Sequence, residues 1–154
     1  MLGPLVNPAK PKNQLVGVFN LELARIYAYL YQKSTVNYTI LNALDGYDEV
    51  SLTCDFKTFS AEGERINSVE DLGFELLNPE QILGGSSVSE SAGIFMTVLE
   101  GEATSAQNNV VLCNAALAIK TIDAAKTFAD CFYEAEEALM SKRALRSFKT
   151  LVNN

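Results

Sequence analysis

The 154-residue sequence contains no histidine and only three cysteines. Without histidine, the chain has no Ser-His or Cys-His pair for nucleophilic catalysis, and it cannot form a zinc site of mixed Cys and His ligands. Cys54, Cys113 and Cys131 form no Cys-x-x-Cys pair, and the last two lie in apolar helical patterns. We therefore expect small, buried, reduced side chains rather than disulfides or nucleophiles.

Positive charge is also scarce. The chain has 12 Lys and Arg against 19 Asp and Glu, a formal net charge of -7. Because a nucleic-acid backbone is itself strongly negative, we expect no nucleic acid as a partner. A phosphate-bearing substrate would need metal ions or local cations to offset the same repulsion.

Long hydrophobic runs are missing as well. The most apolar stretch, residues 110–119, is interrupted by Asn114 and is far too short to cross a bilayer. The first residues show no basic segment followed by an apolar one, as a signal peptide would. We expect a soluble cytoplasmic protein without a membrane partner.

The first half of the chain carries alternating strand and helix patterns. Prolines exclude regular structure in residues 1–11, and residues 14–19 (QLVGVF) then form a short apolar run typical of a buried strand. Asn20 is placed to cap a helix over residues 21–33, and residues 36–44 predict a second strand. A strand, a helix and a strand with short connections predict parallel strands and a right-handed crossover.

A small hairpin and a run of helices are expected to follow. Gly63 marks the turn between strands at residues 57–61 and 65–69. Further helix starts are predicted from capping signals at Asn78-Pro79, Ser87/Glu90, Thr104/Gln107, Asp123 and Ser141. The sequence therefore predicts one α/β domain over residues 1–154, with a partial, mostly parallel sheet, a small antiparallel hairpin and a C-terminal run of helices.

An acidic segment, residues 45–51 (DGYDEVS), directly follows the second predicted strand. Ligands in open α/β sheets bind just outside the carboxyl ends of parallel strands. The adjacent carboxylates of Asp48 and Glu49 suit Mg²⁺, which prefers a few carboxylates together with phosphate oxygens. The alternative is an acidic turn in solvent that binds nothing.

Three other segments are weaker candidates. Residues 2–8 (LGPLVNP) form a rigid loop that, on its residues alone, is best explained as an ordinary connection. Residues 84–87 (GGSS) could hold an anion at a helix start, but Ser87 already caps that helix and no cation is near in the sequence. The cluster Lys142, Arg143, Arg146 and Lys149 is best explained as the solvated face of the last helix.

The order LGPLVNPA, QLVGVF, DGYDEVSL, ILGG and LCNAALAI resembles that of anthranilate phosphoribosyltransferases, over essentially the whole chain. This family has a helical domain followed by an α/β domain of the nucleoside phosphorylase and phosphoribosyltransferase type. The resemblance implies that anthranilate displaces pyrophosphate from C1 of phosphoribosyl pyrophosphate with the help of Mg²⁺. It further implies that Asp48 and Glu49 bind the metal, that Gly3 and Pro4 line the anthranilate pocket, and that no catalytic residue lies in this chain.

The sequence also departs from the family pattern. The glycine-rich phosphate loop (GTGGD), the KHGN segment and an arginine that precedes LGPL are missing, and Asn42-Ala43 stand where the family often has a histidine. We therefore expect the polypeptide to continue upstream of Met1, the domain to be incomplete at its N-terminal side, and this chain alone to be inactive. The family's homodimer forms mainly through the missing helical domain. A pyrimidine-nucleoside phosphorylase-like enzyme and a non-catalytic paralogue that binds ligand without turnover are the alternatives.

Overall fold

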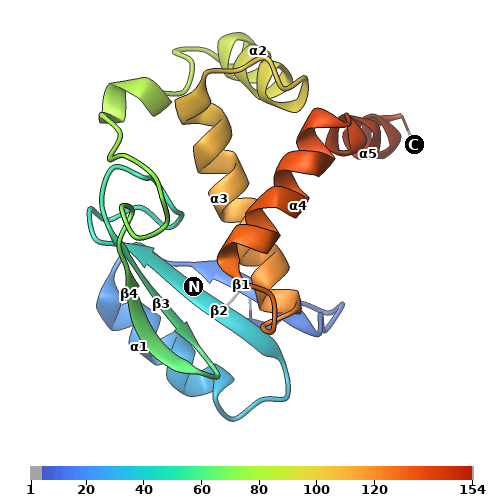
Figure 1. Cartoon of the computed structure of the whole chain (residues 1–154). Coiled ribbons are helices and arrows are strands. Elements are labelled where there is room, and N and C mark those ends of the chain that lie inside the picture. Colours follow the sequence, from blue (N-terminus) through green and yellow to red (C-terminus); the bar gives the residue numbers. More distant parts are fainter. Residues whose placement is uncertain (1–4, 154) are drawn as a thin grey trace.

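The computed structural model describes residues 5–153. Within that range the chain forms four strands, one short 3-10 helix and five α-helices (Figure 1). The elements, in chain order, are β1 (Asn13–Gly17), α1 (Leu21–Tyr31), β2 (Asn37–Ala43), β3 (Phe56–Ser60), β4 (Gly63–Asn67), η2 (Pro79–Ile82), α2 (Val88–Leu99), α3 (Ser105–Ile122), α4 (Phe128–Met140) and α5 (Arg143–Val152).

The strands form one mixed sheet in the order β1-β2-β3-β4. β1 and β2 are parallel, with Asn13 opposite Asn37 and Gly17 opposite Leu41, so the predicted strand-helix-strand unit is confirmed. β3 and β4 form the predicted antiparallel hairpin, and β3 also pairs antiparallel with β2. The α/β class is confirmed, and the hairpin extends the same sheet. In the described residues the sheet is therefore mixed rather than mostly parallel, because only the β1–β2 pair is parallel.

Helix α1 covers one face of the sheet, and α3 with α4 lies on the other (Figure 1). The strand period of two produces this arrangement, because successive side chains point to opposite faces. On β2, Tyr38 and Ile40 pack towards α1, whereas Leu41 and Ala43 pack with Cys113 of α3. The sheet, including the end of β2 that the acidic segment follows, therefore lies between two apolar layers.

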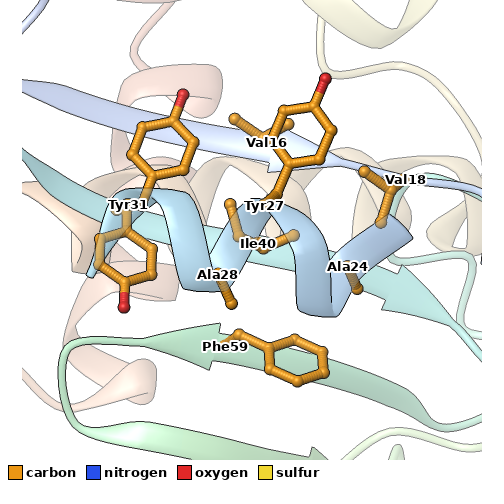
Figure 2. Close-up of a cluster of buried hydrophobic side chains, with 9 residues drawn as sticks. Val16, Val18, Ala24, Tyr27, Ala28, Tyr31, Ile40 and Phe59 are labelled. Carbon is orange, nitrogen blue, oxygen red and sulfur yellow. The ribbon is translucent and has the colours of Figure 1, made fainter. Parts of the chain in front are cut away.

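The layer beneath α1 is rich in tyrosine (Figure 2). Tyr31 stacks on Tyr38 with ring centroids 5.4 Å apart, and its hydroxyl donates to Gln14 Oε1 at 2.5 Å. Asn20 caps the start of α1 as predicted, because its side chain accepts the Leu23 N–H. These contacts fix the crossover helix against the parallel pair, since stacked rings and a paired hydroxyl leave little freedom to slide.

Capping explains where the later helices begin, and two predicted starts were wrong. α3 begins with the predicted reciprocal box of Thr104 and Gln107. Asp123, however, ends α3, and α4 begins instead after Thr127, which forms its own box with Asp130. Ser141 similarly ends α4, and the residue before α5 is Lys142 in the left-handed conformation.

The predicted box at Ser87 is only half formed. Ser87 accepts the Glu90 N–H, but the Glu90 carboxylate accepts from the N–H and hydroxyl of Ser86, both at 2.8 Å. In a full capping box the Glu90 carboxylate would accept the N–H of Ser87, but here it accepts the N–H of Ser86 instead.

The three cysteines are free, and Cys113 and Cys131 are buried as expected. Burial raises the pKa of the Cys113 thiol to about 12, which keeps it protonated and unreactive. None of the helices in residues 5–153 combines the length and the apolar character needed to span a membrane.

Candidate functional site

The acidic loop, residues 45–49, reverses the chain at the carboxyl end of β2. Gly46 N–H donates to the Ala43 carbonyl, and Ala43 N–H donates to the Tyr47 carbonyl, each at 3.0 Å. Gly46 has a φ of 98°, a conformation that glycine adopts without the steric cost of a side chain. The turn brings Asp48 back beside the end of β1.

At that point the backbone of Asp48 lies directly on Gly17, the last residue of β1. A Cβ atom built on Gly17 would lie 1.6 Å from the Asp48 carbonyl oxygen and 2.7 Å from its carbonyl carbon. Any side chain at position 17 would therefore have to displace the acidic loop. The neighbouring Asn42 is buried and donates to the Val18 carbonyl at 2.7 Å, which joins the ends of β1 and β2.

The other end of the acidic loop is tied to helix α3. Val50 is fully buried, and its N–H donates to Asn114 Oδ1 at 2.9 Å. Asn114 Nδ2 donates in turn to the Val50 carbonyl and to the Val110 carbonyl, both at 2.9 Å. One side chain thus satisfies both backbone polar groups of the residue that follows Glu49.

The three acidic side chains of the loop differ in their surroundings. Asp45 accepts hydrogen bonds from the hydroxyls of Thr53 and Ser51. Its N–H also donates to Cys54 Sγ at 3.1 Å. Burial is the main cause that raises the pKa of the Cys54 thiol, and the Asp45 carboxylate raises it further. Because the thiolate is the reactive form, this cysteine is no candidate nucleophile. Asp45 therefore stabilises the loop.

Asp48 and Glu49, by contrast, are exposed, and within residues 5–153 neither carboxylate takes part in an ion pair or a side-chain hydrogen bond. Their oxygen atoms are the ligand type that Mg²⁺ prefers. No group of three or more His, Cys, Asp or Glu side chains in the described residues could hold a metal ion by itself. The pair fits a cation that completes its shell with water and phosphate oxygens, which is the usual manner of Mg²⁺ binding.

The expected substrate residues Gly3 and Pro4 lie outside the described residues. The adjoining Leu5 and Asn7 line a cavity of about 310 Å³ together with Gln14 and Tyr31, near the start of β1. Asp48 lies at the opposite end of that strand, against Gly17.

A larger cavity of about 680 Å³ lies between the hairpin and the C-terminal part of α3, lined by residues such as Thr39, Thr58 and Lys120. It includes neither Asp48 nor Glu49, and it opens near the start of β2. Because ligands of open α/β sheets bind at the carboxyl ends of parallel strands, the acidic loop is the stronger candidate site.

Two further segments behave as the sequence indicated. In the glycine-serine loop, residues 84–87, the Glu90 carboxylate already occupies the donors of Ser86, which leaves that helix start with an internal anion. The four cations at residues 142–149 are exposed, as expected of a solvated face. Arg146 donates to the Ser141 carbonyl, and Lys142 to that of Glu100.

Gly17 and Asn114 were not among the residues expected at the site. The only signal in the sequence was a polar residue within the apolar run at 110–119 and a glycine near the end of the first strand. Both signals are ambiguous without the structure, since an isolated glycine or asparagine has many packing explanations.

Comparison with known proteins defines the class. Residues 1–145 match the family described as glycosyl transferase family, a/b domain. The chain belongs to this family, which agrees with its α/β fold.

Individual relatives specify the resemblance further. The chain is 52% identical over 151 residues to the anthranilate phosphoribosyltransferase of Flavobacterium psychrophilum, a match covering 98% of this chain and 46% of that protein. It is 54% identical over 151 residues to the enzyme of the same name from Christiangramia forsetii, covering 98% and 45%. The resemblance inferred from the motifs is confirmed, and the chain spans about half the length of these relatives.

Solved structures give the same fold. The anthranilate phosphoribosyltransferase of Thermus thermophilus superposes with a TM-score of 0.89 at 23% identity, over 99% of this chain and 46% of that one. The Saccharomyces cerevisiae enzyme in complex with PRPP and Mg superposes with a TM-score of 0.84 at 25% identity, over 96% and 43%.

Proposed function

We propose that this chain contributes the magnesium-binding part of an anthranilate phosphoribosyltransferase, which transfers the phosphoribosyl group of phosphoribosyl pyrophosphate to anthranilate in tryptophan biosynthesis. The identity of about half of all residues to enzymes of this name supports the proposal. The observation that carries it is the exposed pair Asp48 and Glu49, uncommitted within the described residues, at the end of a parallel strand.

In this proposal the two carboxylates hold Mg²⁺ against the pyrophosphate group of the substrate. Bound Mg²⁺ offsets the negative charge that develops on the leaving pyrophosphate. That contribution is needed because the chain itself carries a formal net charge of -7 and would otherwise repel the substrate. Asp45 takes no part in metal binding, since the hydroxyls of Thr53 and Ser51 donate to its carboxylate.

The remaining expectations follow from the same proposal. Gly3 and Pro4 line the anthranilate pocket, the protein is cytoplasmic, and the functional assembly is a homodimer. The relatives are about twice as long as the matched region, so we expect transfer to require segments that correspond to the rest of their length.

A chimera tests the function directly. The matched region of the Flavobacterium psychrophilum enzyme is replaced by this chain, and loss of anthranilate fluorescence is followed with phosphoribosyl pyrophosphate and Mg²⁺. We expect transfer by the chimera, and at least a 100-fold loss, about 2.7 kcal/mol at the barrier, in the variant carrying Asp48→Asn and Glu49→Gln.

The controls separate the alternatives. A chimera with Glu136→Gln and Glu137→Gln, which removes the same charge from α4, should retain full activity. Equal activity in the Asp48 and Glu49 variant would refute the metal assignment. Binding of phosphoribosyl pyrophosphate without turnover in a folded chimera would favour a non-catalytic paralogue. The isolated chain should consume no anthranilate.

A further inference from the structure

The acidic loop combines free side chains with a fixed backbone. Asp48 and Glu49 expose their carboxylates, but the Asp48 carbonyl packs on Gly17 and the next residue after Glu49 is fully buried. The two contacts enclose three consecutive residues, 48–50, which include both carboxylates. A ligand therefore meets groups whose main chain is already held in place.

Gly17 has no conformational reason to be glycine. Its φ is not in the left-handed region, which holds only Gly46, Gly63, Gly73 and Gly101 among the described glycines. An alanine could adopt the backbone of position 17, but its Cβ would lie 1.6 Å from the Asp48 carbonyl oxygen. The requirement at position 17 thus comes from the acidic loop.

Asn114 has a similarly specific geometry. Its Oδ1 accepts the Val50 N–H, and its Nδ2 uses both of its hydrogens, one on the Val50 carbonyl and one on the Val110 carbonyl. The last bond orients the amide on its own helix, and the other two hold the loop. An apolar side chain at position 114 would leave two buried backbone groups without partners, which is costly.

We propose that Gly17 and Asn114 are positioning residues that hold the main chain of Asp48 and Glu49 in the geometry that binds the metal-pyrophosphate group. The inference rests on the proposed function. Neither residue touches substrate or metal; each acts through the acidic loop. Support of this kind is expected around metal sites, where loss of an outer partner typically lowers metal affinity by about 10- to 100-fold.

The test uses the whole 154-residue chain and Mn²⁺ as a paramagnetic probe in the presence of phosphoribosyl pyrophosphate. In the unmodified chain we expect Mn²⁺ to broaden the amide resonances of the acidic loop before those of other acidic surfaces. In Gly17→Ala and in Asn114→Ala, half-maximal broadening should require at least about 10-fold more Mn²⁺. The Val50 amide should also exchange with solvent faster in Asn114→Ala, because its acceptor is lost.

The matched control is Gly93→Ala, on helix α2, where an added Cβ meets nothing within 4 Å. It should leave the Mn²⁺ dependence unchanged. Unchanged Mn²⁺ dependence in Gly17→Ala, with native circular dichroism, would overturn the inference even if Asn114→Ala failed to fold. No selective broadening in the unmodified chain, or the same broadening after Asp48→Asn with Glu49→Gln, would instead overturn the assignment of the metal to this pair of carboxylates, on which the proposed function depends.

Discussion

The acidic loop and the glycine-serine loop are both short polar connections, but they are stabilised in opposite ways. The glycine-serine loop is held by its own helix: Ser86 donates to Glu90 and the Ser91 hydroxyl donates to the Gly85 carbonyl. The acidic loop is held by Asn114, 64 positions away from Val50. At the glycine-serine loop the Glu90 carboxylate accepts hydrogen bonds from Ser86. In the acidic loop the carboxylates of Asp48 and Glu49 are exposed to solvent.

This difference shows what frees a carboxylate for a ligand. When the donors of a loop are satisfied by a carboxylate of the adjoining helix, as Ser86 is by Glu90, that carboxylate is not free for a ligand. A loop whose main chain is fixed by residues distant in sequence can leave its acids to solvent without losing its shape. Four substitutions or pairs of substitutions, taken in order of expected effect, test this difference.

The largest effect is expected for Asn114→Leu. Two buried backbone groups of Val50 lose their partner, which should lower the free energy of unfolding by about 2 to 4 kcal/mol. Urea denaturation followed by circular dichroism measures it. Asn109→Leu on the same helix is the control, and it should change stability by less than about 0.5 kcal/mol, since Asn109 makes no side-chain hydrogen bond within the described residues. Equal effects of the two substitutions would show that the long-range bond contributes nothing.

The glycine-serine loop is tested by a pair of alanine substitutions. A Cβ at Gly85 would lie 2.5 Å from Ser91 N and 2.6 Å from Glu90 Cβ, whereas one at Gly84 meets nothing within 4 Å. Gly85→Ala should therefore lower the unfolding free energy by about 1 to 3 kcal/mol, and Gly84→Ala by much less. The difference between their urea midpoints is the measurement, and similar midpoints would contradict the tight local packing.

A smaller effect concerns Glu90 and pH. Hydrogen bonds from the hydroxyl and then the N–H of Ser86 lower the pKa of Glu90 below its ordinary value of 4.5. Its contribution to stability is therefore present above that value and is lost as the pH falls through the folded pKa. Glu90→Gln should be less stable than the unmodified chain near neutral pH, and the gap should close in acid. A gap that does not change with pH would contradict this.

The smallest effect on stability is expected for the carboxylates of Asp48 and Glu49. Asp48→Asn with Glu49→Gln removes two exposed groups that make no ion pair or side-chain hydrogen bond within residues 5–153. The urea midpoint should stay the same within error, because these side chains make no contact of this kind that stabilises the fold. A clear loss of stability would show that the pair has a structural role that the described contacts do not reveal.

Local signals in the sequence were sufficient for much of the fold. The Asn20 cap, the Thr104 and Gln107 box and the turn at Gly63 each depend on residues close in sequence, and all three are confirmed. The acidic loop was also placed correctly at the end of the second strand. Its role in metal binding stays a prediction.

Sequence patterns did not predict the structure where two possible helix caps lie close together, or where a contact joins residues far apart in the sequence. Asp123 resembles a helix start, but the reciprocal pair Thr127 and Asp130 satisfies two donors and therefore sets the start of α4. Gly17 and Asn114 matter only after β1, the acidic loop and α3 have come together. Contacts of this kind leave no local pattern in a single sequence.

The bond between Val50 and Asn114 also sets an order of events during synthesis. The ribosome adds Val50 64 residues before it reaches Asn114. At the usual elongation rate of about 5–20 residues per second, that interval lasts roughly 3 to 13 seconds. During that time the strands can pair and the loop can pack on Gly17, but the backbone groups of Val50 lack the Asn114 side chain. The acidic loop therefore gains its hydrogen bonds to Asn114 only after α3 has been made.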